Sequence, residues 1–150
     1  MIFQAGRLLI TRRPTGAHLA GLWEFPGGKR RPRESFQQCL VRELREELGI
    51  EVAVTRLLDE VTHTYPEKTV RLKFFLCRLL AGRPRPLGCA AVRWVSPREL
   101  GRYNFPAADA RLLERLVADT QLWRTTALPP KPRATTCPHK ARQQARGSGG

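Results

Sequence analysis

The stretch from Gly28 to Ile50, GKRRPRESFQQCLVRELREELGI, decides how this chain folds and which chemistry it can perform. It follows the pattern G-x5-E-x7-R-E-U-x-E-E-x-G-U, in which U is a bulky aliphatic residue. At average residue frequencies, a gap-free match is expected on the order of once per million chains of this length. The pattern therefore indicates one functional unit. Its fixed positions are Gly28, Glu34, Arg42, Glu43, Leu44, Glu46, Glu47, Gly49 and Ile50.

The second part of this stretch predicts an amphipathic helix from Glu34 to Leu48. Neither Pro nor Gly interrupts it, and large apolar residues recur every four positions, at Phe36, Leu40, Leu44 and Leu48. This period places the apolar side chains on one face of a helix, which then packs against a core. Gly49 is expected to end the helix, because glycine readily adopts the left-handed backbone found just past a helix.

Three glutamates of this helix form a candidate metal site. Glu43, Glu46 and Glu47 stand at i, i+3 and i+4, so their carboxylates share one patch and repel one another unless a cation lies among them. Oxygen-only ligands suit a hard divalent ion, which predicts Mg2+, with Mn2+ as an alternative. A solvated acidic face paired with Arg42 and Arg45 is the simpler reading. The complete spacing favours the metal site.

The composition predicts one folded domain at residues 1–124 and a disordered basic tail at residues 125–150. The chain has 150 residues and a formal net charge of +14, of which the tail carries five basic residues and no acid, leaving +9 on the domain. The electrostatic field of such a positive charge favours anionic partners, either a polyphosphate substrate or nucleic acid. No aromatic residue is interleaved with the charges of the tail, so non-specific contact with polyanions is expected there.

The four cysteines and the absence of long apolar runs predict a cytoplasmic protein. Cys39, Cys77, Cys89 and Cys137 show no C-x-x-C spacing and are expected to be reduced thiols. No apolar run approaches the length of a membrane span, and the N-terminal residues do not resemble a signal peptide. A monomer is the default expectation.

The rest of the domain alternates between predicted strands and helices, which indicates an α+β layered fold. A turn at Gln4–Gly6 has only three residues before it, so the first hairpin arm is nearly absent and the next strand is expected to expose an unsatisfied edge. The true start is therefore expected roughly ten residues upstream. Strands are predicted at 7–12, 23–25, 51–61, 69–80 and 91–95, a helical turn at 96–100, and a second amphipathic helix at 107–121.

Together with the signature, several short motifs resemble the MutT-type branch of the Nudix hydrolase family over residues 1 to about 120. They are Thr11-Arg12-Arg13, the run Leu22 to Lys29 (LWEFPGGK), Arg93-Trp94-Val95 and the run Asn104 to Asp109 (NFPAAD). The resemblance implies a Nudix α/β/α sandwich around a mixed β-sheet, with its first strand apparently truncated. It also implies Mg2+-dependent hydrolysis of a nucleoside triphosphate to the monophosphate and pyrophosphate.

The same resemblance implies roles for individual residues. Glu43, Glu46 and Glu47 would bind the metal with the backbone carbonyl of Gly27, and one glutamate would orient or deprotonate the attacking water. Arg42 would hold a signature glutamate in place, with Glu34 as a further supporting residue. The residues expected to bind the nucleotide are Arg13, His18, Glu24, Phe25, Pro26, Gly27 and Asp109. Asp109 reads equally well as a helix N-terminal residue that complements the helix dipole.

One departure from the family pattern concerns the strand at 91–95. Relatives often carry a glutamate six residues before the strand tryptophan, whereas this chain has Gly88. A general base commonly contributes a factor of about a hundred or more, so activity is expected to be reduced or to depend on the helix carboxylates.

The sequence leaves three functions open. Hydrolysis of oxidised deoxynucleoside triphosphates, above all 8-oxo-dGTP, is the leading hypothesis. A CTP or 5-methyl-dCTP pyrophosphohydrolase on the same scaffold is the enzymatic alternative. A non-catalytic module that reads a damaged base in DNA, as in the C-terminal part of adenine glycosylases, is the third, although such modules typically lack the complete carboxylate set.

Overall fold

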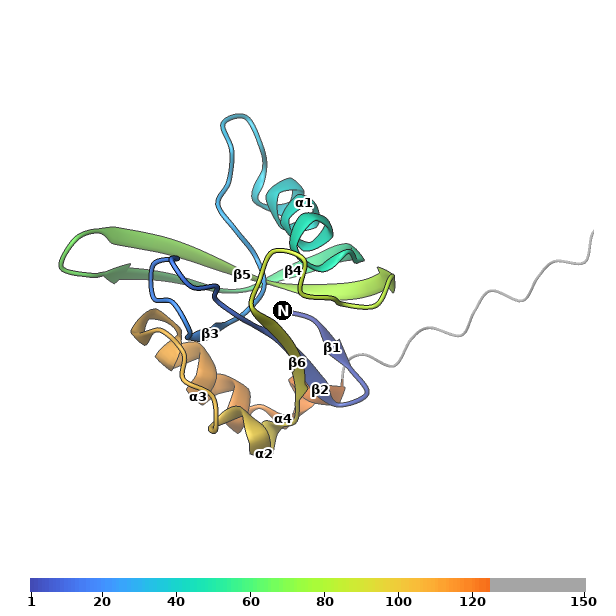
Figure 1. Ribbon diagram of the computed structural model, residues 1–150. Coiled ribbons are helices and arrows are strands. Elements are labelled where there is room, and N and C mark those ends of the chain that lie inside the picture. Colours follow the sequence, from blue (N-terminus) through green and yellow to red (C-terminus); the bar gives the residue numbers. More distant parts are fainter. Residues whose placement is uncertain (125–150) are drawn as a thin grey trace, which may run out of the picture.

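The computed structural model describes residues 1–124, and the predicted tail at 125–150 lies outside the described residues. Figure 1 shows a layered arrangement, with α1 on one side of the strands and α2, α3 and α4 on the other. The elements are β1 (Phe3–Gln4), β2 (Arg7–Arg12), β3 (Trp23–Glu24), α1 (Phe36–Leu48), β4 (Glu51–Thr64), β5 (Thr69–Ala81), β6 (Ala91–Val95), α2 (Pro97–Leu100), the 3-10 helix η1 (Ala107–Asp109), α3 (Ala110–Ala118) and α4 (Thr120–Arg124).

Antiparallel pairing organises the strands around β2. One side of β2 pairs with β6 from Leu8–Val95 to Arg12–Ala91, and the other side pairs with β1 and then with β3. The strands β4 and β5 form a long antiparallel hairpin. A parallel bridge between Ile2 and Cys77 joins this hairpin to the sheet around β2. Parallel and antiparallel pairing therefore coexist, as the predicted mixed sheet requires.

The expectation of an unsatisfied edge on the strand at 7–12 is wrong. Although β1 has only two residues, the segment before it continues along β5, where the amide of Cys77 donates to the carbonyl of Met1 at 2.8 Å. The amide of Leu9 donates to the carbonyl of Ile2 at 2.9 Å. Because β2 has partners on both sides, it is a central strand, and the side chains of Met1, Ile2 and Phe3 are buried.

Alternation along the strands fills two cores, one on each face. Leu8 and Ile10 of β2 point into the core covered by α2, α3 and α4, whereas Leu9 points into the core covered by α1. Leu44 and Leu48 of α1 join Leu9 in that second core. Burial of these apolar residues fixes α1 on the sheet and sets which of its side chains remain outside.

The helix that carries the signature begins and ends at defined caps. Ser35 and Gln38 form a capping box, with the Gln38 amide donating to Ser35 Oγ at 3.1 Å and the Ser35 amide donating to Gln38 Oε1 at 2.8 Å. The helix therefore begins at Phe36, two residues later than predicted, and leaves Glu34 in the preceding loop. Gly49 ends it with φ 67°, as expected.

The second predicted helix, at 107–121, is divided into three pieces. η1 and α3 follow one another, and then the chain breaks at Asp119, whose backbone leaves the helical region. The Asp119 carboxylate accepts from the Gln121 amide at 3.1 Å, and the Trp123 indole donates to the Leu116 carbonyl at 2.7 Å. Burial of Trp123 turns the last segment, α4, back onto the core.

Two further predictions are tested by the described residues. Cys39, Cys77 and Cys89 are free thiols, and Cys137 lies outside the described residues. Within residues 1–124, no helix has the length and apolar character needed to cross a bilayer.

Candidate active site

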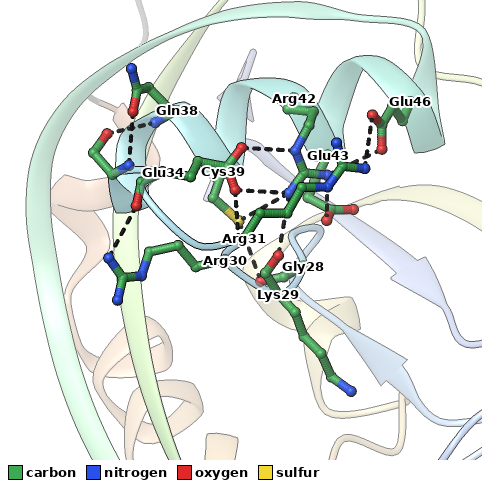
Figure 2. A network of polar contacts seen from close by, with 11 residues as sticks. Gly28, Lys29, Arg30, Arg31, Glu34, Gln38, Cys39, Arg42, Glu43 and Glu46 are labelled. Carbon is green, nitrogen blue, oxygen red and sulfur yellow. Dashed lines mark hydrogen bonds and ion pairs between the residues drawn. The ribbon is translucent and has the colours of Figure 1, made fainter.

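The guanidinium of Arg42 lies at the centre of a polar network between α1 and the loop before it (Figure 2). Its Nε and Nη2 donate to the two carboxylate oxygens of Glu34 at 2.8 and 3.0 Å. Its Nη1 donates to Glu43 Oε1 at 2.7 Å and to Glu46 Oε2 at 3.1 Å. A further bond of 3.2 Å reaches the carbonyl of Lys29. Arg42 therefore pairs with three glutamates of the signature, Glu34, Glu43 and Glu46.

Glu34 anchors this network from the loop side. Hydrogen bonds from Arg42 and from the backbone amide of Arg31, the latter 2.9 Å long, lower the pKa of Glu34 to about 2. The same carboxylate, together with Glu43, raises the pKa of Arg42 above its usual range. Both groups therefore keep their charges throughout the physiological pH range, and the loop stays tied to α1.

The turn at Gly27-Gly28 lies directly against the carboxylate of Glu43. A Cβ atom at Gly28 would lie 2.2 Å from Glu43 Cδ and 2.5 Å from each carboxylate oxygen. Any side chain at this position would have to displace the Glu43 carboxylate. The backbone of Gly28 and the carboxylate of Glu43 are therefore in close contact, and we call this contact the glycine cradle.

Gly28→Ala is expected to lower activity by about tenfold or more, because the added methyl group must displace the Glu43 carboxylate. Stability should change little, since the colliding atoms belong to the end of a flexible side chain. Steady-state kinetics and a thermal unfolding curve measure the two effects. Gly101→Ala is the matched control, because a Cβ at Gly101 would meet nothing within 4 Å. Equal activity of the two variants would contradict the cradle.

Glu47 is half-buried on the next turn of the helix. Burial, followed by the charges of Glu43 and Glu24, raises its pKa to about 7, and Glu46 adds to this effect. The loop before β6 packs against it, because the amides of Leu87 and Gly88 donate to the Glu47 carbonyl at 2.9 and 3.0 Å. A Cβ at Gly88 would lie 3.0 Å from Glu47 Cγ. Gly88, in the place where relatives often have glutamate, therefore lies beside Glu47.

The three predicted metal ligands share one region but do not converge. In residues 1–124, no group of three His, Cys, Asp or Glu side chains is arranged to hold a metal ion. The reason is that Arg42 holds one oxygen of Glu43 and one of Glu46. The donor set nevertheless fits a hard cation, because the carboxylates of Glu43, Glu46 and Glu47 and the Gly27 carbonyl offer only oxygen ligands. The charges of Glu43, Glu24 and Glu46 raise the pKa of Glu47, and a bound cation would relieve this repulsion.

A second cluster joins the predicted base-binding residues. Arg13, the residue after β2, forms an ion pair with Glu24 of β3, and the Arg13 Nε also donates to the carbonyl of His18 at 2.7 Å. Burial, followed by the charge of Glu24, raises the pKa of Asp109 to about 7. The charges of Arg13 and Glu24 act on both Glu47 and Asp109, so this ion pair lies near both carboxyl groups. The predicted metal ligands of α1 and the predicted base-binding residues are therefore near one another in the fold.

Three predicted nucleotide-binding residues differ in how they face this cluster. Asp109 stands at the N-cap of α3, and its side chain makes no capping hydrogen bond there. Phe25 packs its ring against Phe74 and Phe105, at centroid distances of 5.8 and 5.1 Å. The His18 ring faces the β4–β5 hairpin, where it lies 3.6 Å from Glu67. His18 therefore contributes its carbonyl, not its ring, to the Arg13 cluster.

Asp109→Asn is expected to flatten the pH dependence of stability. The folded pKa of Asp109, about 7, lies above the ordinary value of 3.8, so the folded protein binds an extra proton between these pH values and loses stability as pH rises through them. At pH 8 the variant should be more stable than the wild type, by at most roughly 4 kcal/mol. Urea unfolding at pH 4, 6 and 8 measures this. Parallel curves would show that Asp109 does not titrate as described.

Sequence reasoning assigned no role to several residues that contact the predicted site residues. Arg31 lies 3.5 Å from Glu46 Oε1, and Phe74 and Phe105 pack on Phe25. The sequence offered one signal for Arg31, because the basic residues Lys29, Arg30, Arg31 and Arg33 lie directly before Glu34. The aromatic contacts have no local signal, because they join residues far apart in the chain.

Comparisons with known proteins identify several similar chains. The model of the NUDIX domain matches residues 1–115. An 8-oxo-dGTP diphosphatase of Proteus vulgaris is 48% identical over 69 residues, which cover 46% of this chain and 62% of that protein. A CTP pyrophosphohydrolase of Escherichia coli K12 is 38% identical over 118 residues, covering 79% of this chain and 87% of that protein. The solution structure of the E. coli ORF135 protein superposes with a TM-score of 0.65 at 38% identity, covering 79% of this chain and 84% of that one.

Proposed function

Because the chain belongs to the MutT-type branch of the Nudix hydrolase family, we propose that it hydrolyses oxidised deoxynucleoside triphosphates, above all 8-oxo-dGTP. The products are the monophosphate and pyrophosphate, so the enzyme would cleanse the nucleotide pool of the cytoplasm before DNA synthesis. The observation that carries this proposal is the complete carboxylate set of α1, held by Arg42 beside the Gly27-Gly28 turn. We expect it to act as a monomer.

The glutamates of α1 would act at the phosphate groups of the substrate. Glu43, Glu46 and Glu47, with the carbonyl of Gly27, would hold Mg2+ or Mn2+. When bound, such an ion stabilises charge on phosphoryl oxygens and makes water a better nucleophile. Glu47 is the candidate to orient the attacking water or accept its proton, because it is half-buried and the loop at Leu87-Gly88 fixes its backbone. Arg42 holds Glu43 and Glu46 in position and does not itself react.

The cluster of Arg13, Glu24 and Asp109 would contact the nucleobase of the substrate. A carboxylate accepts hydrogen bonds from N–H groups of a base, and a protonated carboxyl group also donates. With a pKa of about 7, Asp109 is available in both forms near neutral pH. Phe25, packed between Phe74 and Phe105, gives an apolar wall beside these polar groups. A neutral but polar ring, such as oxidised guanine, suits this mixture.

A cytosine-type substrate is the second candidate, because a CTP pyrophosphohydrolase is similar over most of both chains. Asp109 is compatible with this reading too, since a carboxylate accepts from an exocyclic amine. A non-catalytic reader of damaged bases is disfavoured because the carboxylate set is complete. The cradle beside Glu43 has no purpose in such a module.

One substrate panel tests these alternatives. Purified protein with Mg2+ is offered dGTP, 8-oxo-dGTP, CTP, 5-methyl-dCTP and a dinucleoside polyphosphate, and pyrophosphate and orthophosphate are counted separately. The proposal expects pyrophosphate release with the highest kcat/KM for 8-oxo-dGTP. A preference for CTP or 5-methyl-dCTP would establish the second candidate. Failure to turn over any compound would favour the non-catalytic reading.

A further inference from the structure

We propose that Arg31 alternates between two anions, neutralising Glu46 in the resting enzyme and binding the polyphosphate of the substrate once Glu46 has taken a metal ion. This inference deepens the proposed function and rests on it. It assigns a binding role to a residue of the loop between β3 and α1, outside the glutamates of the signature.

Both carboxylate oxygens of Glu46 face a guanidinium group (Figure 2). Oε2 accepts from Arg42 Nη1 at 3.1 Å, and Oε1 lies 3.5 Å from Arg31 Nη2. A divalent cation bound to Glu46 would be repelled by both guanidinium groups, so we expect at least one of them to move away. The question is which arginine moves.

Arg42 is poorly suited to move. Its guanidinium also donates to both oxygens of Glu34, to Glu43 and to the carbonyl of Lys29, and its side chain is only 17% exposed. The Arg31 side chain is 62% exposed, and within residues 1–124 it makes no ion pair or hydrogen bond besides the ion pair with Glu46. An exposed pair of this kind contributes little to stability, so Arg31 leaves Glu46 easily.

The backbone of Arg31 keeps its guanidinium at the site. Its amide donates to Glu34 Oε2 at 2.9 Å, which ties the residue to the same carboxylate that holds Arg42. After leaving Glu46, the side chain remains within reach of the region beside the α1 carboxylates. The anion that arrives there with the metal ion is the polyphosphate, and an arginine fork suits phosphate oxygens.

The neighbouring arginines differ from Arg31 in their surroundings. Arg30 points away from the glutamates of α1, because its Nη1 donates to the carbonyl of Glu34 at 3.0 Å and its guanidinium lies 4.9 Å from the Phe36 ring centroid. Arg33 is exposed, and no ion pair or hydrogen bond of its side chain is found within the described residues. Arg33 therefore provides a matched control with the same charge in the same loop.

The first experiment measures ion binding without nucleotide. Mn2+ is titrated into wild-type protein, Arg31→Gln and Arg33→Gln, with free Mn2+ followed by electron paramagnetic resonance. Arg31→Gln should bind Mn2+ about two- to fivefold more tightly than Arg33→Gln, because Glu46 no longer has to exchange one cation for another. Equal affinities of the two variants would show that Arg31 does not compete for Glu46, which would overturn the proposal.

The second experiment measures nucleotide binding at saturating Mg2+. Arg31→Gln should raise KM for the preferred triphosphate by about tenfold with a smaller change in kcat, and Arg33→Gln by less than twofold. Arg31→Lys should recover part of the loss by keeping the charge. An unchanged KM in Arg31→Gln would refute the phosphate contact. If the wild type hydrolyses no triphosphate, the proposed function fails, and the affinities of the variants for a nonhydrolysable triphosphate analogue still decide the role of Arg31.

Discussion

Glu47→Gln is expected to lower kcat by about a hundredfold or more while leaving the fold intact. The substitution changes the residue proposed as both a metal ligand and the base, yet the amide keeps nearly the same volume. Folding should not suffer, because Glu47 faces the like charges of Glu43, Glu24 and Glu46. Steady-state kinetics with the preferred triphosphate, together with circular dichroism and thermal unfolding, measure both parts of this expectation.

Glu114→Gln is the matched control for this prediction. Glu114 lies on α3, is exposed, and carries the same change of charge far from the carboxylates of α1. Its activity should stay within about twofold of the wild type, because isolated surface substitutions rarely have large effects. Unchanged turnover of Glu47→Gln would refute the assigned role. Loss of the folded state would instead show that the half-buried carboxylate stabilises the loop before β6.

Arg42→Lys is expected to weaken metal affinity or activity by about ten- to a hundredfold, the usual range for a residue that positions metal ligands. Lysine keeps the charge but cannot bond Glu34 through two parallel donors while also reaching Glu43 and Glu46. Glu43 and Glu46 then lose their fixed positions. Mn2+ titration and kcat/KM for the preferred triphosphate measure the effect.

A spectroscopic measurement separates positioning from simple loss of charge. Hydrogen bonds from Arg42 are the largest cause of the low pKa of Glu34, about 2, so Arg42→Lys should move this pKa toward its ordinary value of 4.5. A carboxyl-detected nuclear magnetic resonance titration follows it. Arg45→Lys, an exposed substitution on the same helix, should change neither the pKa of Glu34 nor activity. A shift in both variants would contradict the network as described.

Much of the fold was predictable because its signals are local. The period of Phe36, Leu40, Leu44 and Leu48 predicts α1, Gly49 predicts its end, and the strand at 91–95 is observed with the predicted bounds. The predictions failed where distant segments decide the outcome. The edge of β2 is covered by pairing with β1, β3 and β6, and burial of Trp123 breaks the last helix at Asp119.

The sequence alone determined that Glu43, Glu46 and Glu47 lie on adjacent turns of one helix, because helical geometry follows from residues close in the chain. Only the tertiary structure decided which partner each carboxylate has. Arg42 and Arg31 pair with Glu46, the loop at Gly88 packs on Glu47, and the charges of Arg13 and Glu24 act on Asp109. These contacts join residues up to about a hundred positions apart, so they exist only once both cores have packed against the sheet.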